Sequence, residues 1–199
     1  MYTPEKWKMN SYQELDEFIK TYGFAAVISA DLEASHLPLL FKPNDGEMGS
    51  LYGHFARSNP HWKVVDGSKM LVVFSGPHSY ISPTWYESKP AVPTWNYSAV
   101  HVKGIAMLTD KNITIDALDE TVKKYEPNLS IPEDFKSKLS NGIVGFKIEV
   151  SSIEGKEKLG QHRSKADQLG VAAALSSGQN LESQQLYEYM LKKNIGLGS

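Results

Sequence analysis

The stretch that decides the fold reads Leu51-Tyr52-Gly53-His54-Phe55-Ala56-Arg57-Ser58-Asn59-Pro60-His61-Trp62. Residues 49–55 predict a β-strand, and Asn59 followed by Pro60 predicts the start of a short helix that ends at Asp66-Gly67. The first backbone N–H groups of a helix lack internal partners, so a strand-to-helix corner can bind an anion. Arg57 and Ser58 make this corner a candidate phosphate site. The alternative is an ordinary N-cap beside a solvated arginine.

Histidine and tryptophan are concentrated around this corner. Residues 52–104 hold four of the six histidines and three of the four tryptophans, in two further strings, Gly76-Pro77-His78-Ser79-Tyr80-Ile81-Ser82-Pro83-Thr84-Trp85-Tyr86 and Val92-Pro93-Thr94-Trp95-Asn96-Tyr97. A loop-rich run of large rings predicts a pocket for a flat aromatic or anionic ligand. The side chains that could enclose it are Trp62, Trp85, Tyr86, Trp95 and Tyr97. Core packing and dimer contacts are the alternative roles for these rings.

The histidines in this region have two interpretations. His54, His61, His78 and His101 could ligate a metal or haem in principle. Their spacing matches no helical ligand pair, and the chain has no cysteine, so we predict no metal site. Buried imidazoles hydrogen-bonded to the backbone are the alternative to a ligand role.

The rest of the chain predicts strands followed by helices. The expected strands span residues 24–30, 36–41 with Pro38 at an edge or bulge, 70–74, 100–108 and 143–153. We expect residues 70–74 to be central and buried on both faces. The expected helices follow the capping box at Ser11-Tyr12-Gln13-Glu14 and span residues 115–125, 132–139, 166–175 and 183–193. This order indicates a mainly β protein with appended helices, built as an antiparallel barrel.

Bulk composition is ordinary for a globular protein. The chain has 199 residues, 41% hydrophobic and 22% charged, and no linker-like stretch, which predicts one domain over 1–199 with C-terminal helices at about 165–195. The lack of cysteine, of a signal pattern and of a long apolar run predicts a cytoplasmic protein without a membrane partner. A net charge of −2 gives no general attraction to DNA, so DNA binding would need a local basic patch. The only compact basic run spans residues 156–165.

Three long strings closely resemble the PaiB family, whose members are described as FMN-binding negative transcriptional regulators. These are residues 53–62, 76–86 and 92–97, quoted above. The resemblance extends from Met1-Tyr2-Thr3-Pro4 through His36-Leu37-Pro38 to Ile153-Glu154-Gly155-Lys156-Glu157-Lys158-Leu159, and so covers nearly the whole chain. No nucleophile elbow, P-loop or dinucleotide fingerprint competes with it.

The resemblance implies an FMN-binding split β-barrel of the pyridoxamine-phosphate-oxidase kind. It implies a homodimer with FMN in grooves between the subunits. The stretch that corresponds to the phosphate-binding corner contains His54, Arg57, Ser58 and Asn59. The strand from Asn96 to Gly104 would pass the flavin ring with Trp95, Asn96 and His101, and we include Trp85 among the ring contacts.

A second family string near the end of the barrel is only partly present. PaiB members commonly read Lys-Leu-Ser-Gln-Asn-Arg, whereas this chain reads Lys158-Leu159-Gly160-Gln161-His162-Arg163. We include the retained Gln161 and Arg163 among the cofactor-binding residues. Because the wider superfamily contains haem-binding split barrels, the imidazole gained at His162 makes haem the alternative cofactor.

These observations define the functions to be tested. The first is an FMN-binding regulator of the PaiB type that acts indirectly, through a small molecule or another protein. The alternatives are a flavin-dependent oxidoreductase acting on a small electron acceptor and a haem-binding protein. Direct DNA binding lacks a base-reading motif.

Overall fold

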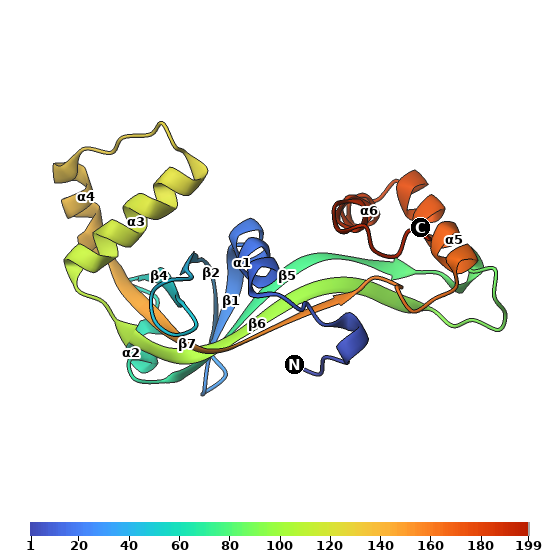
Figure 1. Cartoon of the computed structure of the whole chain (residues 1–199). Helices are drawn as coiled ribbons and strands as arrows, with labels where there is room; N and C mark the ends of the chain where they lie inside the picture. Colours follow the sequence, from blue (N-terminus) through green and yellow to red (C-terminus); the bar gives the residue numbers. More distant parts are fainter. Residues whose placement is uncertain (199) are drawn as a thin grey trace. The chain divides into compact units, whose positions relative to one another are not determined.

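A computed structural model describes residues 1–198. Within that range the chain forms seven strands and six α-helices (Figure 1). The strands are β1 Phe24–Ser29, β2 Ala34–Pro38, β3 Leu40–Lys42, β4 Ser50–Ala56, β5 Lys69–Ile81, β6 Thr94–Leu108 and β7 Ile143–Lys158. The helices are α1 Tyr12–Thr21, α2 Trp62–Val65, α3 Lys111–Tyr125, α4 Glu133–Leu139, α5 Lys165–Ser177 and α6 Leu181–Lys193, with single 3₁₀ turns at Glu5–Trp7, Pro83–Trp85 and Ser140–Gly142.

The seven strands form one antiparallel sheet that is not closed. Its order is β2-β1-β5-β6-β7-β4-β3, so β2 and β3 are the two edges. Only Leu39 separates these edges in the chain, and β2 also contacts β4. The sheet therefore curls until its edges meet at one chain segment, without a hydrogen-bonded ladder between them. This split barrel with appended helices confirms the predicted fold class.

The predicted strand over residues 36–41 is two strands. Its first half pairs with β1, with Pro38 opposite Phe24, and its second half pairs with β4, with Phe41 opposite Leu51. Between them, the Leu39 N–H donates to the Gly23 carbonyl at 2.8 Å. Proline cannot donate to a ladder, and the break follows it directly.

The structure also corrects the expected loops. β5 continues from Phe74 to Ile81, β6 begins at Thr94 and β7 runs to Lys158. Residues 76–81 and 94–97 therefore lie on strands, although Gly, Pro and Ser suggested loops. In β5, Met70, Val72 and Phe74 are buried while Leu71 and Val73 are half-buried. Residues 70–74 are thus buried on one face only.

The chain divides into two compact units, and β5, β6 and β7 contribute to both. Unit 1 comprises residues 1–11, 75–99 and the chain from Glu154 onward; unit 2 comprises residues 12–74 and 100–153. Each unit is described by itself below. A single domain over the whole chain stays a prediction.

Unit 2 has an aromatic and aliphatic core inside the curled sheet. Phe55 on β4 and Phe146 on β7 are buried, with ring centroids 4.7 Å apart, and Phe74 is fully buried on β5. Fully burying a phenylalanine contributes about 1.5–3 kcal/mol. The alternation of strand residues thus supplies the core of unit 2.

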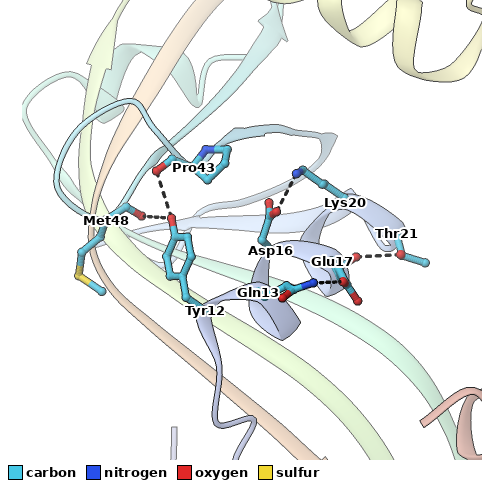
Figure 2. A network of polar contacts seen from close by, with 8 residues as sticks. All are labelled: Tyr12, Gln13, Asp16, Glu17, Lys20, Thr21, Pro43 and Met48. Atoms are coloured by element: carbon cyan, nitrogen blue, oxygen red, sulfur yellow. Dashed lines mark hydrogen bonds and ion pairs between the residues drawn. The ribbon is translucent and has the colours of Figure 1, made fainter.

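Helix α1 is tied to the turn that joins β3 and β4. The Tyr12 hydroxyl donates to the carbonyls of Pro43 and Met48, at 3.3 and 3.2 Å (Figure 2). Burial, together with the negative charge of Asp16, raises the pKa of Tyr12 above its ordinary value of 10.0. The phenol therefore stays protonated and remains a donor across the physiological range.

In unit 1, the N-terminal segment lies against the end of β7. Lys156 is 6% exposed, and its ammonium lies 5.2–5.6 Å from the ring centroids of Tyr2, Trp7 and Tyr97. It also donates to the Tyr2 carbonyl at 3.1 Å. Such cation–π contacts stabilise a desolvated cation. Helices α5 and α6 pack against each other in the same unit (Figure 1).

Candidate functional site

The corner after β4 is a tight turn rather than a helix start. Helix α2 begins at Trp62 and has four residues, so the predicted cap at Asn59 with Pro60 in the first position is wrong. The Asn59 Oδ1 instead accepts the His61 N–H at 3.0 Å, and the Asn59 N–H donates to the Ala56 carbonyl at 2.9 Å. Asparagine commonly holds turns through its own side chain in this way. Asn59 therefore fixes the backbone of the corner.

Arg57 is exposed but anchored. Its Nε donates to the Asn141 carbonyl and its Nη2 to the Ile143 carbonyl, both at 2.7 Å. The Arg57 backbone N–H also donates to the Gly142 carbonyl, at 2.8 Å. A guanidinium has five N–H donors in a rigid plane, so three remain available. The carbonyls hold the guanidinium in place, and Ser58 beside it is also exposed.

Behind the corner, His61 joins three segments of unit 2. The ring is 2% exposed, its Nδ1 lies 2.8 Å from Ser35 Oγ, and its Nε2 lies 2.9 Å from Ser29 Oγ. Asn59 Nδ2 donates to Ser35 at 3.0 Å, and Ser29 donates to the Asp31 carboxylate. These contacts define one direction of donation, in which Ser35 donates to Nδ1 and Nε2–H donates to Ser29.

Burial favours the neutral form of the His61 imidazole. Burial lowers the pKa of His61 below its ordinary value of 6.5, and the charges of Glu33 and Asp31 only partly oppose this. Sequence reasoning placed His61 in the aromatic region but missed its serine partners. They lie 26 and 32 residues away and carry no local signal.

His54 and His101 occupy other parts of unit 2. His54 lines a small cavity of about 20 Å³ between β4 and α3, together with Thr114 and Thr121. Burial lowers the pKa of His54 below 6.5. His101 is half-buried on β6. Both imidazoles lie in the unit that contains Arg57, Ser58 and Asn59.

The other predicted site residues lie in unit 1, where Asn96 and Arg163 line one small cavity with Tyr86 and Asp167. Asn96 is 2% exposed. The Arg163 guanidinium lies over the Tyr86 ring, 4.5 Å from its centroid. Its Nε is buried and finds no hydrogen-bond partner among residues 1–198. The cavity volume of about 10 Å³ is the size of a single water molecule.

Both ends of the Gln161 side-chain amide are hydrogen-bonded to the backbone of its own turn. Its Oε1 accepts the Leu159 N–H at 2.8 Å, and its Nε2 donates to the Glu157 carbonyl at 2.7 Å. Gly160 has a φ of +85°, a conformation that glycine adopts without steric cost. Glycine therefore fits the place of the family's usual serine.

Trp85 and Trp95 differ in their surroundings. Trp85 ends a 3₁₀ turn whose Ser82 side chain caps the Thr84 N–H at 3.2 Å. Trp95 on β6 is 49% exposed and lies between His78 and Tyr80, with both ring centroids at 6.2 Å. These three rings form an outward-facing aromatic surface on unit 1.

The ten predicted cofactor-binding residues are therefore divided between the units. Unit 2 holds His54, Arg57, Ser58, Asn59 and His101, and unit 1 holds Trp85, Trp95, Asn96, Gln161 and Arg163. Their roles at a cofactor stay predictions.

Residues 1–198 contain neither a metal-binding cluster of side chains nor a membrane-spanning helix. No group of three or more histidine or acidic side chains within residues 1–198 is arranged to hold a metal ion. Over the same range, no helix combines the length and the apolar character required to cross a bilayer.

Comparison with known proteins identifies the family. A family model described as "Putative FMN-binding domain" matches residues 1–152. The chain is 37% identical to the Protease synthase and sporulation protein PAI 2 of Bacillus subtilis (strain 168), over 98% of this chain and 100% of that protein. The PaiB strings of the sequence lie within this match.

Solved structures share the fold at low identity. The FAD and Heme binding protein from Mycobacterium smegmatis matches with a TM-score of 0.58 at 14% identity, over 76% of this chain and 73% of that chain. The Flavocytochrome Anf3 from Azotobacter vinelandii matches with a TM-score of 0.51 at 14% identity, over 77% and 74%. The family match and the identity to PAI 2 show that this chain belongs to the PaiB family of FMN-binding-domain proteins.

Proposed function

We propose that the protein binds FMN, with the flavin phosphate at Arg57 and Ser58. The observation that supports this is the anchored guanidinium of Arg57, which is exposed while two carbonyls hold it at 2.7 Å. Charge-assisted hydrogen bonds to phosphate are about twice as strong as neutral ones, and a guanidinium that is already ordered loses less entropy on binding. Asn59 and His61 act behind the pair by fixing the turn.

The test distinguishes the contribution of the flavin phosphate to binding from that of the flavin ring. The purified protein is titrated with FMN and with riboflavin, which lacks the phosphate, and binding is followed by flavin absorbance and fluorescence. We expect FMN to bind at least about tenfold more tightly than riboflavin, because the phosphate adds charge-assisted hydrogen bonds. Equal affinity for the two flavins would contradict the proposal that Arg57 and Ser58 bind the phosphate.

We further propose that the protein is a homodimer whose subunits complete the flavin grooves. The outward side of β6 presents Ile105 and Met107, each 38% exposed, and apolar side chains on an exposed sheet face are typical of an interface. Analytical ultracentrifugation tests this. A monomer at micromolar concentration, with and without FMN, would contradict it.

The regulatory role that goes with the PaiB name is best explained by an indirect mechanism. The one compact basic run does not form a free cationic surface, because Lys156 is buried under aromatic rings. Lys158 in the same run donates to the Trp95 carbonyl at 2.8 Å. We expect no gel shift of DNA at micromolar protein and moderate salt. A salt-sensitive shift would restore direct DNA binding.

An FMN-dependent oxidoreductase is the related proposal for the same cofactor. The FMN would supply the redox chemistry, while the protein would position the ring. Steady oxidation of NADH or NADPH by FMN-loaded protein would support turnover on a small electron acceptor. Bound FMN without turnover across acceptors would leave a flavin-responsive regulator.

Haem is a second candidate ligand, and His78 is the observation that favours it. His78 is exposed, and its Nδ1 lies 3.1 Å from the Gly76 carbonyl. A backbone acceptor at Nδ1 fixes the tautomer in which Nε2 is unprotonated and can bind iron. Haem titration should then give a Soret band that is lost in His78→Ala and kept in the control His36→Ala, a histidine on β2. A band unaffected by His78→Ala would exclude this ligand.

A further inference from the structure

Positive charge in unit 1 is concentrated around one indole ring, that of Trp7. The ammonium groups of Lys6, Lys156 and Lys158 lie 4.7, 5.3 and 5.8 Å from the centroid of this ring. His162 contacts the same ring edge to face, with the two centroids 5.7 Å apart. Ammonium groups that share one ring repel one another, so carboxylates of the chain or an anion from solution would stabilise this arrangement.

The backbone holds this cluster together. The N-terminal segment runs beside the end of β7, where the Met9 N–H donates to the Gly155 carbonyl at 3.1 Å. Lys156 and Lys158 are two residues apart on β7, and alternate residues of a strand point to the same face. Both ammonium groups accordingly reach Trp7. Strand pairing therefore fixes the place of the indole beside the two lysines.

The carboxylates close to this cluster already have partners. These are the Met1 amino group for Glu154 at 2.7 Å, Lys193 for Glu157 at 3.3 Å, Lys8 for Glu5 at 3.9 Å and the Ser88 N–H for Asp167 at 2.9 Å. Lys158 donates to uncharged oxygens, those of the Thr94 hydroxyl and the Trp95 carbonyl. Within residues 1–198, Lys6 and His162 contact the Trp7 ring and have no carboxylate partner.

Two pKa values reflect the surrounding positive charge. Burial, followed by the charges of Lys156 and Arg163, lowers the pKa of Lys158. Burial, followed by the charges of Lys6, Arg163 and Lys158, lowers the pKa of His162. The neighbouring charges that act on both groups are positive. An anion bound among these side chains would oppose that effect, because an opposite charge favours the protonated form.

The indole N–H of Trp7 is a second, independent observation. Its Nε1 is buried and has no hydrogen-bond partner within residues 1–198. Buried donors are nearly always paired, so an unpaired one indicates an acceptor from outside the chain. Lys6 is exposed, and its ammonium lies at the end of a flexible four-carbon stem. It can therefore move beside the ring and let an anion reach this donor.

We propose that Lys6, Lys158 and the Trp7 N–H bind a free phosphate dianion, with the exposed His162 beside them. The two ammonium charges match the charge of the dianion. Its four oxygens can accept hydrogen bonds from ammonium and indole groups at once, and such charge-assisted bonds are strong. This site lies in unit 1, whereas the flavin phosphate is proposed for Arg57 in unit 2. Either site can therefore fail without the other.

The first experiment titrates inorganic phosphate into the whole chain by isothermal titration calorimetry, with phosphorus-31 line widths as a second measurement. Lys6→Gln should weaken phosphate affinity about threefold, because it removes one exposed ionic contact. Added salt should also weaken binding by the wild type. The matched control is Lys8→Gln, an exposed lysine of the same segment whose partner is Glu5, and it should leave the affinity unchanged.

Trp7→Phe tests the unpaired donor. Phenylalanine keeps an aromatic ring beside the lysines but has no N–H, so phosphate affinity should fall about tenfold. Trp62→Phe is the control, since its indole N–H already donates to the Arg57 carbonyl at 3.0 Å, and phosphate affinity should not change. Near-ultraviolet circular dichroism verifies the tertiary packing of each variant. Affinities of Lys6→Gln and Trp7→Phe equal to those of their controls, or no saturable binding by the wild type at millimolar phosphate, would overturn the proposal.

Competition with FMN distinguishes this site from the proposed flavin site. Saturating FMN should leave phosphate affinity unchanged, and Arg57→Ala should weaken FMN binding without weakening phosphate binding. Displacement of phosphate by FMN but not by riboflavin would mean that the cluster holds the flavin phosphate, and it would overturn the free-phosphate site. If Arg57→Ala retained FMN while Lys6→Gln lost phosphate, the flavin assignment would fail and the phosphate site would stand.

Discussion

The chain has two arginines, and each lies at a corner beyond a strand of the barrel. Each has a side-chain amide two residues away, Asn59 for Arg57 and Gln161 for Arg163. Both amides bind backbone groups of their own turn, Asn59 at 3.0 Å and Gln161 at 2.8 and 2.7 Å. At both corners, therefore, a side-chain amide holds the turn by hydrogen bonds to its backbone.

The arginines themselves differ. Arg57 is exposed, with Nε and Nη2 bonded to carbonyls and its other donors available. Arg163 stacks over Tyr86 at 4.5 Å, and its buried Nε has no partner among residues 1–198. An anchored guanidinium with spare donors can bind an anion, whereas a stacked one mainly contributes packing. A sequence that places arginine beside a turn does not distinguish these outcomes.

Replacing Arg57 should have the largest effect on flavin binding. Arg57→Ala removes a charge-assisted contact to the phosphate and should weaken FMN affinity at least about tenfold. Riboflavin affinity should change less, because riboflavin has no phosphate. Flavin absorbance titrations measure both. FMN retained as tightly as in the wild type would show that Arg57 only ties residues 141–143 to the corner.

Arg163 should affect stability more than affinity. Arg163→Ala removes the stacked side chain and should lower the free energy of unfolding by about 1–2 kcal/mol in urea. Arg163→Met keeps apolar contact with Tyr86 and removes the unpartnered Nε, so it should cost less than half as much. If both variants kept their stability but lost FMN tenfold, Arg163 would be a cofactor ligand and the contrast between the corners would disappear.

Replacing the two amide side chains should distinguish the stability of each turn from its role in ligand binding. Asn59→Ala and Gln161→Ala each lose two hydrogen bonds and should each lower the free energy of unfolding by about 1 kcal/mol or more. Only Asn59→Ala should also weaken FMN binding, because it loosens the corner that holds Arg57. Parallel urea unfolding and FMN titration measure the two effects. Equal loss of affinity in both variants would contradict this.

The histidines beside the corners should give a smaller, pH-dependent difference. Because the pKa of His61 is lowered in the folded protein, the unfolded chain binds more protons below about pH 6.5. Stability from this group is therefore present above about pH 6.5 and is lost as the pH falls through the lowered pKa of the folded protein. Unfolding of His61→Gln at several pH values should show a flatter dependence than the wild type.

His162→Gln is the matched variant at the other corner. His162 also has a lowered pKa, caused first by burial and then by Lys6, Arg163 and Lys158. The residue as a whole is exposed although its ring packs against Trp7 at 5.7 Å, so solvent reduces its contribution and the pH dependence should change little. A larger change in His162→Gln than in His61→Gln would contradict the importance given to the serine network.

Ser58 should show the smallest effect. Ser58→Ala removes one hydroxyl that the proposed site directs at the phosphate, and FMN affinity should fall about threefold. Ser164→Ala provides the control, since that hydroxyl caps α5 by accepting the Asp167 N–H at 3.2 Å. A change in FMN affinity only in the control would exclude Ser58.

The sequence predicted the barrel because its strands are apolar and its turns have strong local signals. The strand over residues 24–30 and the helices near the end of the chain are observed close to their expected bounds. The extensions of β5 through Gly76 and Pro77 and of β6 through Trp95 were missed. There the pairing of long neighbouring strands overrides residues that disfavour β structure.

The candidate site was less predictable than the fold. Arg57 and Ser58 were found because they are adjacent to a turn signal. The serine partners of His61 were not, since Ser35 and Ser29 lie 26 and 32 residues away from it in the sequence. Local patterns also cannot show that the carbonyls of residues 141 and 143 hold Arg57.

The break between Pro38 and Leu40 has a consequence for how the barrel resists aggregation. Unpaired strand edges are templates for pairing with other chains. Here both edges of the sheet meet in one continuous segment, and Leu39 between them is 2% exposed. A proteolytic cut or a long insertion at Leu39 would free both edges at once. Limited proteolysis at that one peptide should therefore cause the protein to assemble edge to edge.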